Sequence, residues 1–170
     1  MKPSAEYFRQ VLHYDRLTGV FTWKHRDGIH RSWNTKYAGK VAGSVDADGY
    51  WIIRLDSRTY KAHRVAWVYE NGGDIHEDVE IDHRNGDRMN NSISNLRVAN
   101  DAQNAANAKV RIDNKSGAKG VSWHRRIGKW QAQINECGKR RSLGYYDTVE
   151  QASSAYRERA RALHGDFARL

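Results

Sequence analysis

The sequence is poor in cysteine and has no long apolar run. One cysteine, Cys137, occurs in 170 residues. This count excludes an intramolecular disulfide and a zinc site built on several thiolates, and it indicates a reducing compartment. No apolar run approaches the roughly 20 residues of a membrane-spanning helix, and residues 1–15 contain no apolar core of a secretory signal. We therefore expect a cytoplasmic protein with no membrane segment.

The positive charge lies mainly in the C-terminal third. The formal net charge is +9. Residues 105–170 hold 14 Lys and Arg against 6 Asp and Glu, whereas the other 104 residues hold 15 against 14. Such a segment is attracted to polyanions, with nucleic acid first and a membrane surface second. A basic protein with no such partner would show the same charge.

The N-terminal part predicts a mixed α+β arrangement. The chain is long enough for one domain or two small ones. Residues 5–14 predict a short helix, residues 26–36 a loop, and residues 46–49 (DADG) a hairpin turn. Strands are expected at 20–23 and 50–55 and from residue 60 into Ala62-His63-Arg64, with a helix-compatible segment at 65–69.

Residues 80–107 contain the side chains best suited to catalysis. A strand at 79–81 leads into Asp82 and His83, and we expect a loop at 84–94, a strand at 95–98 and a helix at 101–109. Carboxylate and amide oxygens suit a hard cation such as Mg²⁺, and a neutral histidine beside it can take a proton from water. The alternative is structural: Asp82 caps a turn, His83 packs in the core, and the asparagines are loop residues.

The C-terminal part predicts a small sheet-and-helix domain. Residues 111–117 form a candidate linker. Strands are expected at 119–124, 129–135 and 139–143, and a helix at about 149–164 begins with the capping-box pattern of Thr148 and Gln151. Gly165 would end that helix. With a period of two, Gln131, Gln133 and Asn135 share one strand face, while Trp130, Ala132 and Ile134 share the other.

The polar face of this sheet could enter a DNA groove. Arg reads guanine there, and Gln or Asn reads adenine. The polar side chains on or beside the strands are Lys119, Ser122, His124, Arg125, Arg126, Gln133, Asn135, Arg140, Arg141 and Ser142. A solvated sheet face with no partner is the alternative.

The central stretch resembles the HNH nuclease family, in the variant whose last His is replaced by Asn. The resemblance lies in His63-Arg64, Ile81-Asp82-His83, Asn85-Gly86-Asp87, Asn90-Asn91, Asn95-Leu96-Arg97, Gln103-Asn104 and Asn107. It implies a ββα-metal fold in which Asp82 and Asn104 bind a divalent cation and His83 is the general base. Asn95 would hold the site loop and orient His83, and Asn107 is the fallback ligand. For His63 the resemblance implies a structural role or a hydrogen bond near the site.

Residues 116–170 resemble the AP2/ERF DNA-binding domain. The resemblance lies in Gly120-Val121, Gly128-Lys129-Trp130, Leu143-Gly144, Tyr146-Asp147-Thr148, Ala155-Tyr156 and the segment 163–170. It implies a three-stranded sheet in the major groove, with Lys119, Ser122, His124, Arg125, Arg126, Gln133, Asn135, Arg140 and Ser142 facing DNA. Plant members typically carry Arg at the positions of Ser122 and Asn135, Glu at Gln133 and Trp at Ser142, so the base sequence that they read does not carry over.

Together these patterns predict an α+β protein with a ββα-metal nuclease domain at residues 1–110 (core about 60–109), a linker at 111–117 and an AP2/ERF-like domain at 118–170. We expect an endonuclease that uses Mg²⁺ or another divalent cation such as Mn²⁺ on double-stranded DNA, of the phage or mobile-element homing type and monomeric. The sheet would raise the concentration of the nuclease at its site. The alternatives are a DNA-binding regulator with a degenerate nuclease half, and a basic protein that binds RNA or a membrane surface.

Overall fold

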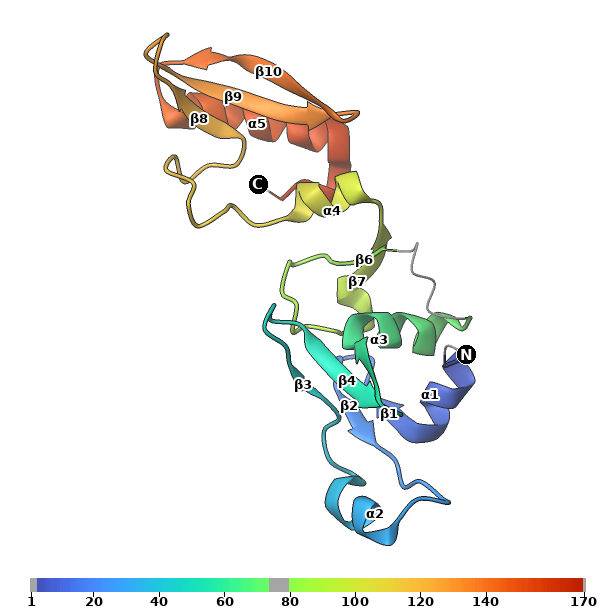
Figure 1. Cartoon of the computed structure of the whole chain (residues 1–170). Helices are drawn as coiled ribbons and strands as arrows, with labels where there is room; N and C mark the ends of the chain where they lie inside the picture. The colour runs from blue at the N-terminus through green and yellow to red at the C-terminus, as the bar shows by residue number, and fades with distance from the viewer. Residues whose placement is uncertain (1–2, 74–79, 170) are drawn as a thin grey trace. The chain divides into compact units, whose positions relative to one another are not determined.

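The chain folds into two compact units, residues 1–100 and residues 101–170, in a computed structural model that describes residues 3–73 and 80–169 (Figure 1). Each unit mixes helices with antiparallel strands. No helix in these described ranges is long and apolar enough to cross a membrane. The predicted domain boundary at residue 110 lies inside the second of the two units.

The first unit begins with helix α1 (Ala5–Val11), which the Ser4 hydroxyl caps by accepting a hydrogen bond from the Tyr7 amide at 3.3 Å. The predicted helix over 5–14 is three residues too long. Leu12–Tyr14 instead forms strand β1, which pairs with β2 (Phe21–Trp23) as a hairpin. The alternation of buried Leu12 and Tyr14 with exposed His13 lets this strand bury one face, which outweighs the weak local helix signal.

Helix α2 (Arg31–Tyr37) lies where a loop was predicted. The ring of His30 caps it by accepting a hydrogen bond from the Ser32 amide. Trp33 and Tyr37, one turn apart, pack against the core, and the Trp33 ring lies 5.4 Å from that of Trp23 in an edge-to-face contact. The prediction was wrong because this helix depends on an aromatic contact with another element and not on its own helix propensity.

A three-stranded antiparallel sheet follows, in the order β3 (Ser44–Val45), β4 (Trp51–Leu55) and β5 (Arg58–Lys61). The hairpin turn predicted at 46–49 joins β3 to β4, and the turn into β5 places Asp56 and Ser57 at positive φ. Helix α3 (Ala62–Asn71) begins directly after β5. The strand predicted to continue through Arg64 therefore ends at Lys61, and His63 lies on a helix.

The core of the first unit is aromatic and aliphatic. The side chains of Phe8, Phe21, Leu12, Ile53, Leu55 and Val65 are almost fully buried. Each contributes roughly 1.5–3 kcal/mol of burial free energy by area-based reasoning. Rings from separate elements meet here: Tyr14 stacks on Phe21 at 4.6 Å. This core fixes the N-terminal hairpin against α3, which carries His63.

The segment with the Asp-His pair is a β-hairpin. Strand β6 (Glu80–His83) pairs antiparallel with β7 (Leu96–Ala99), and a short 3-10 helix, η1 (Ile93–Asn95), precedes β7. The predicted order of strand, loop and strand is confirmed, although residue 79 lies outside the described residues and Asn95 ends η1 instead of starting the strand. Helix α4 (Asp101–Asn107) follows and belongs to the second unit.

The second unit contains a three-stranded antiparallel sheet in the order β10 (Lys139–Tyr146), β9 (Lys129–Glu136) and β8 (Val121–His124). Helix α5 (Val149–His164) covers one face of it (Figure 1), and a 3-10 turn, η2 (Gly165–Phe167), ends the fold. The predicted hairpins, helix bounds and capping box are present. Ala132, Ile134, Ala152 and Tyr156 form the core, as the predicted face pattern requires.

Gly120 shows how closely this small core is packed. Its φ is +70°, and a Cβ built on it would lie 2.2 Å from the ring of Tyr156. Only glycine fits both the backbone conformation and the space. The helix therefore sits directly on the start of β8.

Candidate active site

Asp82 and His83 lie at the end of β6 and are both buried, at 7% and 5% exposure. Asp82 is opposite Arg97 of β7 in the strand register. The Arg97 Nε donates to Asp82 Oδ2 at 2.8 Å, and its Nη2 lies 2.8 Å from the same oxygen. Both side chains of this ion pair are buried, so each is the other's partner away from solvent.

The His83 ring is held by Asn91. Its Nε2 lies 3.2 Å from Asn91 Oδ1, in a buried contact. Burial lowers the pKa of His83, although the hydrogen bond with Asn91 and the charge of Asp82 oppose this shift. Because an amide oxygen can only accept, Nε2 carries the proton of the neutral ring and Nδ1 carries the lone pair. At neutral pH the histidine is therefore uncharged and oriented.

Asn91 is itself fixed by the N-terminal hairpin. Its amide nitrogen donates to Met89 O at 3.1 Å, and its backbone oxygen accepts from the Tyr14 hydroxyl at 2.7 Å. The backbone of Gly19 lies against it: a Cβ there would be 2.3 Å from the Asn91 carbonyl carbon. From the sequence, Asn91 was expected only as a loop residue. Its one signal was its place in the resembling pattern, because the Tyr14 hydroxyl that binds its backbone oxygen is 77 residues away.

Asn95 braces the loop between the two strands. Its Nδ2 donates to Asn85 Oδ1 at 3.0 Å and to the Asn90 backbone oxygen at 2.7 Å, while its Oδ1 accepts from the Asn85 amide at 3.1 Å. These bonds fit the expected role of holding the loop. The ring of His83 is oriented by its hydrogen bond to Asn91 Oδ1, so Asn95 acts on the ring through the loop.

His63 lies beside His83, with ring centroids 4.8 Å apart at 70°. Burial, aided by the ring of His83 and the cations of Lys61 and Arg64, lowers its pKa to about 3. Its Nδ1 has no hydrogen-bond partner among the described residues. The third ring of the group is Tyr50, whose centroid is 5.4 Å from that of His63. The ring of His63 is thus uncharged at neutral pH and packs against the ring of His83.

Asn104 and Asn107 lie on α4, in the second unit. Asn104 is half-buried, and Asn107 is buried. Because Asp82 belongs to the first unit, the pairing of Asp82 with either amide as metal ligands stays a prediction.

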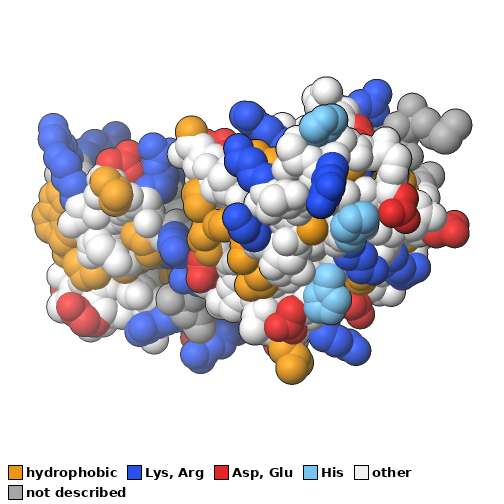
Figure 2. Space-filling view, turned by 90° about the horizontal axis from the view of Figure 1, so that it is seen from below, with side chains coloured by type: hydrophobic (Ala, Val, Ile, Leu, Met, Phe, Trp, Pro, Cys, Tyr) orange, Lys and Arg blue, Asp and Glu red, His pale blue; other side chains and the backbone are white. Residues whose placement is uncertain are grey.

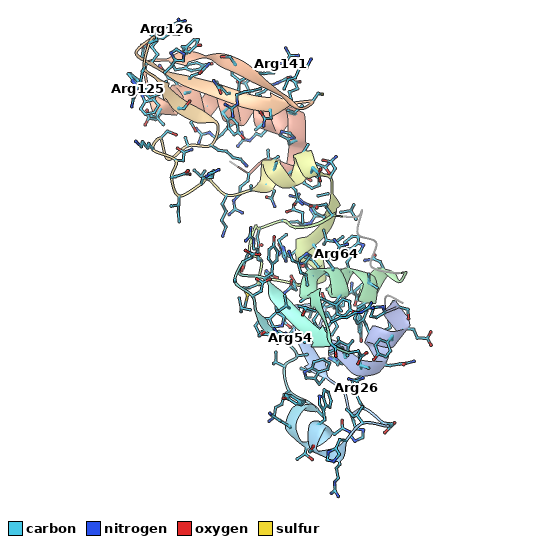
Figure 3. The ribbon with its side chains drawn as sticks, in the orientation of Figure 1. Arg26, Arg54, Arg64, Arg125, Arg126 and Arg141 are labelled. Carbon is cyan, nitrogen blue, oxygen red and sulfur yellow. The ribbon has the colours of Figure 1, made fainter. Side chains whose placement is uncertain are left out.

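The predicted DNA-facing residues of the second unit lie mostly on one sheet face and its end. In the strand register Ser142 is opposite Gln133, and Arg140 is opposite Asn135, which places these four side chains together. Ser122 and His124 belong to β8, and Arg125 and Arg126 form the turn after it (Figure 3). On the same face Gln131 donates to Ser142 Oγ and Tyr145 OH, both at 3.2 Å.

Lys119 is placed differently from the other predicted contacts. Its ammonium donates to the backbone oxygens of Ala105, Ala106 and Ala108, where it caps the C-terminal end of α4. Burial lowers its pKa to about 8. Lys119 therefore joins α4 to the sheet within the second unit, and a DNA contact at this residue stays a prediction.

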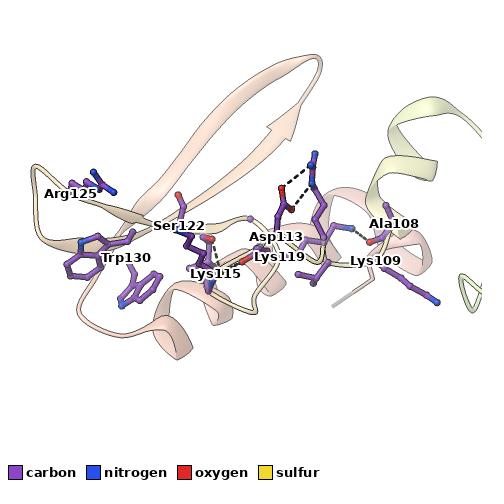
Figure 4. A pocket seen from close by; sticks show the side chains of 15 residues that line it. Ala108, Lys109, Asp113, Lys115, Lys119, Ser122, Arg125 and Trp130 are labelled. Atoms are coloured by element: carbon purple, nitrogen blue, oxygen red, sulfur yellow. Dashed lines mark hydrogen bonds and ion pairs between the residues drawn. The ribbon is translucent and has the colours of Figure 1, made fainter.

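A pocket of about 770 Å³ lies beside Lys119 (Figure 4). It is lined by the chain at 108–116 and by β8, with Trp123 and Trp130 in edge-to-face contact at 5.2 Å. The segment predicted as a linker, residues 111–117, forms part of the pocket lining. Ser116 Oγ donates to the Ala118 and Val121 backbone oxygens at 3.0 and 2.8 Å, so the segment is tied to the sheet by hydrogen bonds.

Comparisons with known proteins show which proteins this chain is similar to. A family model described as HNH endonuclease matches residues 60–106. Protein 3.8 of Escherichia phage T7 is 37% identical over 114 residues, which cover 65% of this chain and 93% of that protein. An uncharacterized HNH endonuclease of Acanthamoeba polyphaga mimivirus is 30% identical over 116 residues, or 68% of this chain and 59% of that protein.

Two further similarities are more limited. APETALA2-like protein 2 of Oryza sativa subsp. indica is 45% identical over 38 residues, which cover 22% of this chain and 9% of that protein. A solved structure described as DNA binding and cleavage by the HNH homing endonuclease I-HmuI aligns with 91% of this chain and 82% of its own, with a TM-score of 0.45 and 19% identity.

Proposed function

The chain belongs to the HNH endonuclease family and is a nuclease, and on that premise we propose that it hydrolyses phosphodiester bonds in duplex DNA with a divalent metal ion. The observation that carries the proposal is the state of His83. A buried neutral imidazole, oriented by Asn91 and adjacent to the Asp82 side chain, has what a general base needs.

His83 would take the proton of the attacking water. With Nε2–H donated to Asn91, the lone pair on Nδ1 accepts that proton, and the charge that forms on the ring is stabilised by Asn91 Oδ1 and the Asp82 carboxylate. His63 stays neutral beside it and excludes water. Asn95 keeps the loop that carries Asn91 in one conformation.

The family resemblance implies a hard divalent cation. It assigns the carboxylate of Asp82 and the amide of Asn104 as ligands, and Mg²⁺ or Mn²⁺ binds such ligands while keeping several waters. A cluster of three or more His, Cys, Asp or Glu side chains is absent from the described residues, which favours a cation with few protein ligands over a zinc site. When bound, the cation would stabilise charge on the phosphate and on the leaving 3′ oxygen.

A DNA-binding regulator with a degenerate nuclease half is the second candidate. The observation that favours it is the buried Asp82–Arg97 ion pair, since Arg97 already neutralises the carboxylate that would bind the metal. In this alternative the Asp-His pair is structural, and the protein holds DNA without cutting it.

The second unit would be the DNA-gripping module. A three-stranded antiparallel sheet with one covering helix, an exposed Arg-, Asn- and Ser-bearing face, and the short plant similarity support an AP2/ERF-like role. We propose Ser122, His124, Arg125, Arg126, Gln133, Asn135, Arg140 and Ser142 as its DNA contacts. Lys119 is left out, because its ammonium is bound to α4.

The phage relative supports a phage or mobile-element origin, with action in the cytoplasm of the host cell. We propose that the protein acts as a monomer. One catalytic centre then cuts one strand in each encounter, so nicked plasmid should appear before linear plasmid.

A plasmid nicking assay with Mg²⁺ or Mn²⁺ tests the function. The wild type should nick supercoiled plasmid, and His83→Ala should lower the rate by about 10²–10⁴-fold because the general base is gone. Asp82→Asn removes the charge but keeps a polar partner for Arg97, so circular dichroism should show an intact fold. Folded wild type that binds plasmid but does not nick it with either metal would establish the regulator instead.

A further inference from the structure

Basic side chains alone do not mark a site on this protein. Lys and Arg are spread over the face drawn in Figure 2, with Asp and Glu between them. One group in the first unit differs, and we name it the Tyr50 cluster: Tyr50, Lys61 and Arg88. The Lys61 Nζ lies 4.0 Å from the centroid of the Tyr50 ring, and the Arg88 Cζ lies 4.6 Å from it. Two cations thus share one aromatic ring.

The two cations lack the partners that neutralise other charges in the unit. Arg97 pairs with Asp82 and Arg26 with Asp56. Lys61 and Arg88 have no ion pair to a carboxylate in the described part of the chain, although both are exposed. Arg88 donates instead to a backbone oxygen, that of Asp48, at 2.6 Å. Positive charges without a neighbouring carboxylate attract anions from solution.

The cluster also holds these side chains in place before a ligand arrives. Cation–π contact with Tyr50 and the bond to Asp48 restrict two long side chains that would otherwise be mobile. Less conformational entropy is then lost when an anion binds. The guanidinium of Arg88 and the ammonium of Lys61 are both good donors to the oxygens of a phosphate diester.

The position of the cluster connects it to the active site. Lys61 is the last residue of β5 and precedes His63 on α3, while Arg88 belongs to the loop that carries Asn91. The Tyr50 ring centroid is 5.4 Å from that of His63 and 6.3 Å from that of His83. The two cations therefore lie on a ring that neighbours the proposed general base.

We propose that Lys61 and Arg88 form a phosphate-binding subsite that holds the DNA backbone beside His83. The bound groups are backbone phosphates that flank the one being cut, one for each cation. The inference rests on the proposed function, since it assigns the substrate of the same site. It adds a contact in the nuclease unit that grips DNA independently of the C-terminal sheet.

Salt dependence of binding tests the subsite. The probe is a fluorescein-labelled duplex of about 30 base pairs with mixed sequence, titrated by anisotropy at several KCl concentrations with EDTA present. Each lost phosphate contact lowers the slope of log K against log[KCl] by about 0.9. Lys61→Gln or Arg88→Gln should therefore weaken binding about eightfold at ~100 mM KCl, and the double variant about 60-fold.

Lys36→Gln with Lys40→Gln is the matched control. It removes the same net charge from exposed positions of the same unit, and Lys36 also lies over a tyrosine ring, that of Tyr37, at 5.1 Å. This pair should leave the slope unchanged. An equal loss of slope in the control would show that net charge alone is responsible, and an unchanged slope in the Tyr50-cluster variants would refute the subsite.

Plasmid nicking by the same proteins separates this proposal from the proposed function. Nicking that is intact in the wild type, with a salt slope that the Lys61 and Arg88 substitutions leave unaltered, would remove the subsite and keep the nuclease. A wild type that fails to nick, with a slope that falls only in the Tyr50-cluster variants, would remove the nuclease and keep a phosphate-binding surface.

Discussion

The ring of His63 should make the first unit sensitive to mild acid. His63 is 5% exposed, and burial next to His83, Lys61 and Arg64 lowers its pKa from 6.5 to about 3. The unfolded chain binds a proton at this histidine below pH 6.5, whereas the folded chain does not. Stability is therefore fully present above pH ~6.5 and is lost as the pH falls towards ~3.

The size of the effect follows from the two pKa values. A shift of the His63 pKa from 6.5 to about 3 corresponds to a total loss of about 5 kcal/mol of unfolding free energy. That full loss is reached only when the pH is low enough to protonate the folded state as well. At pH ~5 the loss is about 2 kcal/mol relative to pH ~7.5. That value depends almost entirely on the unfolded chain, because a folded pKa anywhere below about 4 gives nearly the same result.

Urea titration of the full chain, followed by tryptophan fluorescence at the two pH values, measures this loss. Glutamine at position 63 cannot be protonated. In the His63→Gln variant the difference in unfolding free energy between the two pH values should therefore be about 2 kcal/mol smaller than in the wild type. The comparison uses the unfolding transition of the first unit. His13→Gln is the control, since it removes an exposed histidine of β1. If His63→Gln keeps the full wild-type difference, the neutral buried ring is not the cause and the reasoning fails.

Three further predictions concern the hairpin and the sheet. Tyr14→Phe removes the hydroxyl that donates to the buried backbone oxygen of Asn91. The unfolding free energy measured by urea titration should fall by about 1–3 kcal/mol, and nicking should be slower. Gly19→Ala should abolish nicking, because the new Cβ would meet the Asn91 backbone. Gly28 has a similar φ but nothing within 4 Å of a Cβ built on it, so Gly28→Ala should retain nicking. An equal loss of nicking in both variants would point to backbone strain alone. Arg125→Ala with Arg126→Ala should lower the salt slope of duplex binding by about 1.8, and an unchanged slope would show that this turn does not meet DNA.

Local patterns predicted the C-terminal unit well. The capping box of Thr148 and Gln151 and the Ala-rich spacing of α5 depend on residues three or four apart, and the hairpins on short turns. The first unit was harder to predict. The helix at 31–37 forms because Trp33 meets Trp23, and α1 ends at Val11 because Leu12–Tyr14 pairs with β2. Contacts of this kind are not encoded in any one segment.

By itself the sequence determined the nuclease family, through the order of Asp82-His83, Asn95 and Asn104, because that spacing is written along the chain. Only the tertiary structure decided what holds the site. It paired Asp82 with Arg97, gave His83 its hydrogen-bond acceptor in Asn91, and fixed Asn91 through Tyr14, 77 residues away. It also turned Lys119 towards α4. The physical reason is burial: a polar group that packing removes from water is stabilised by a hydrogen-bond partner, and the groups that can serve are those that packing brings nearby in space.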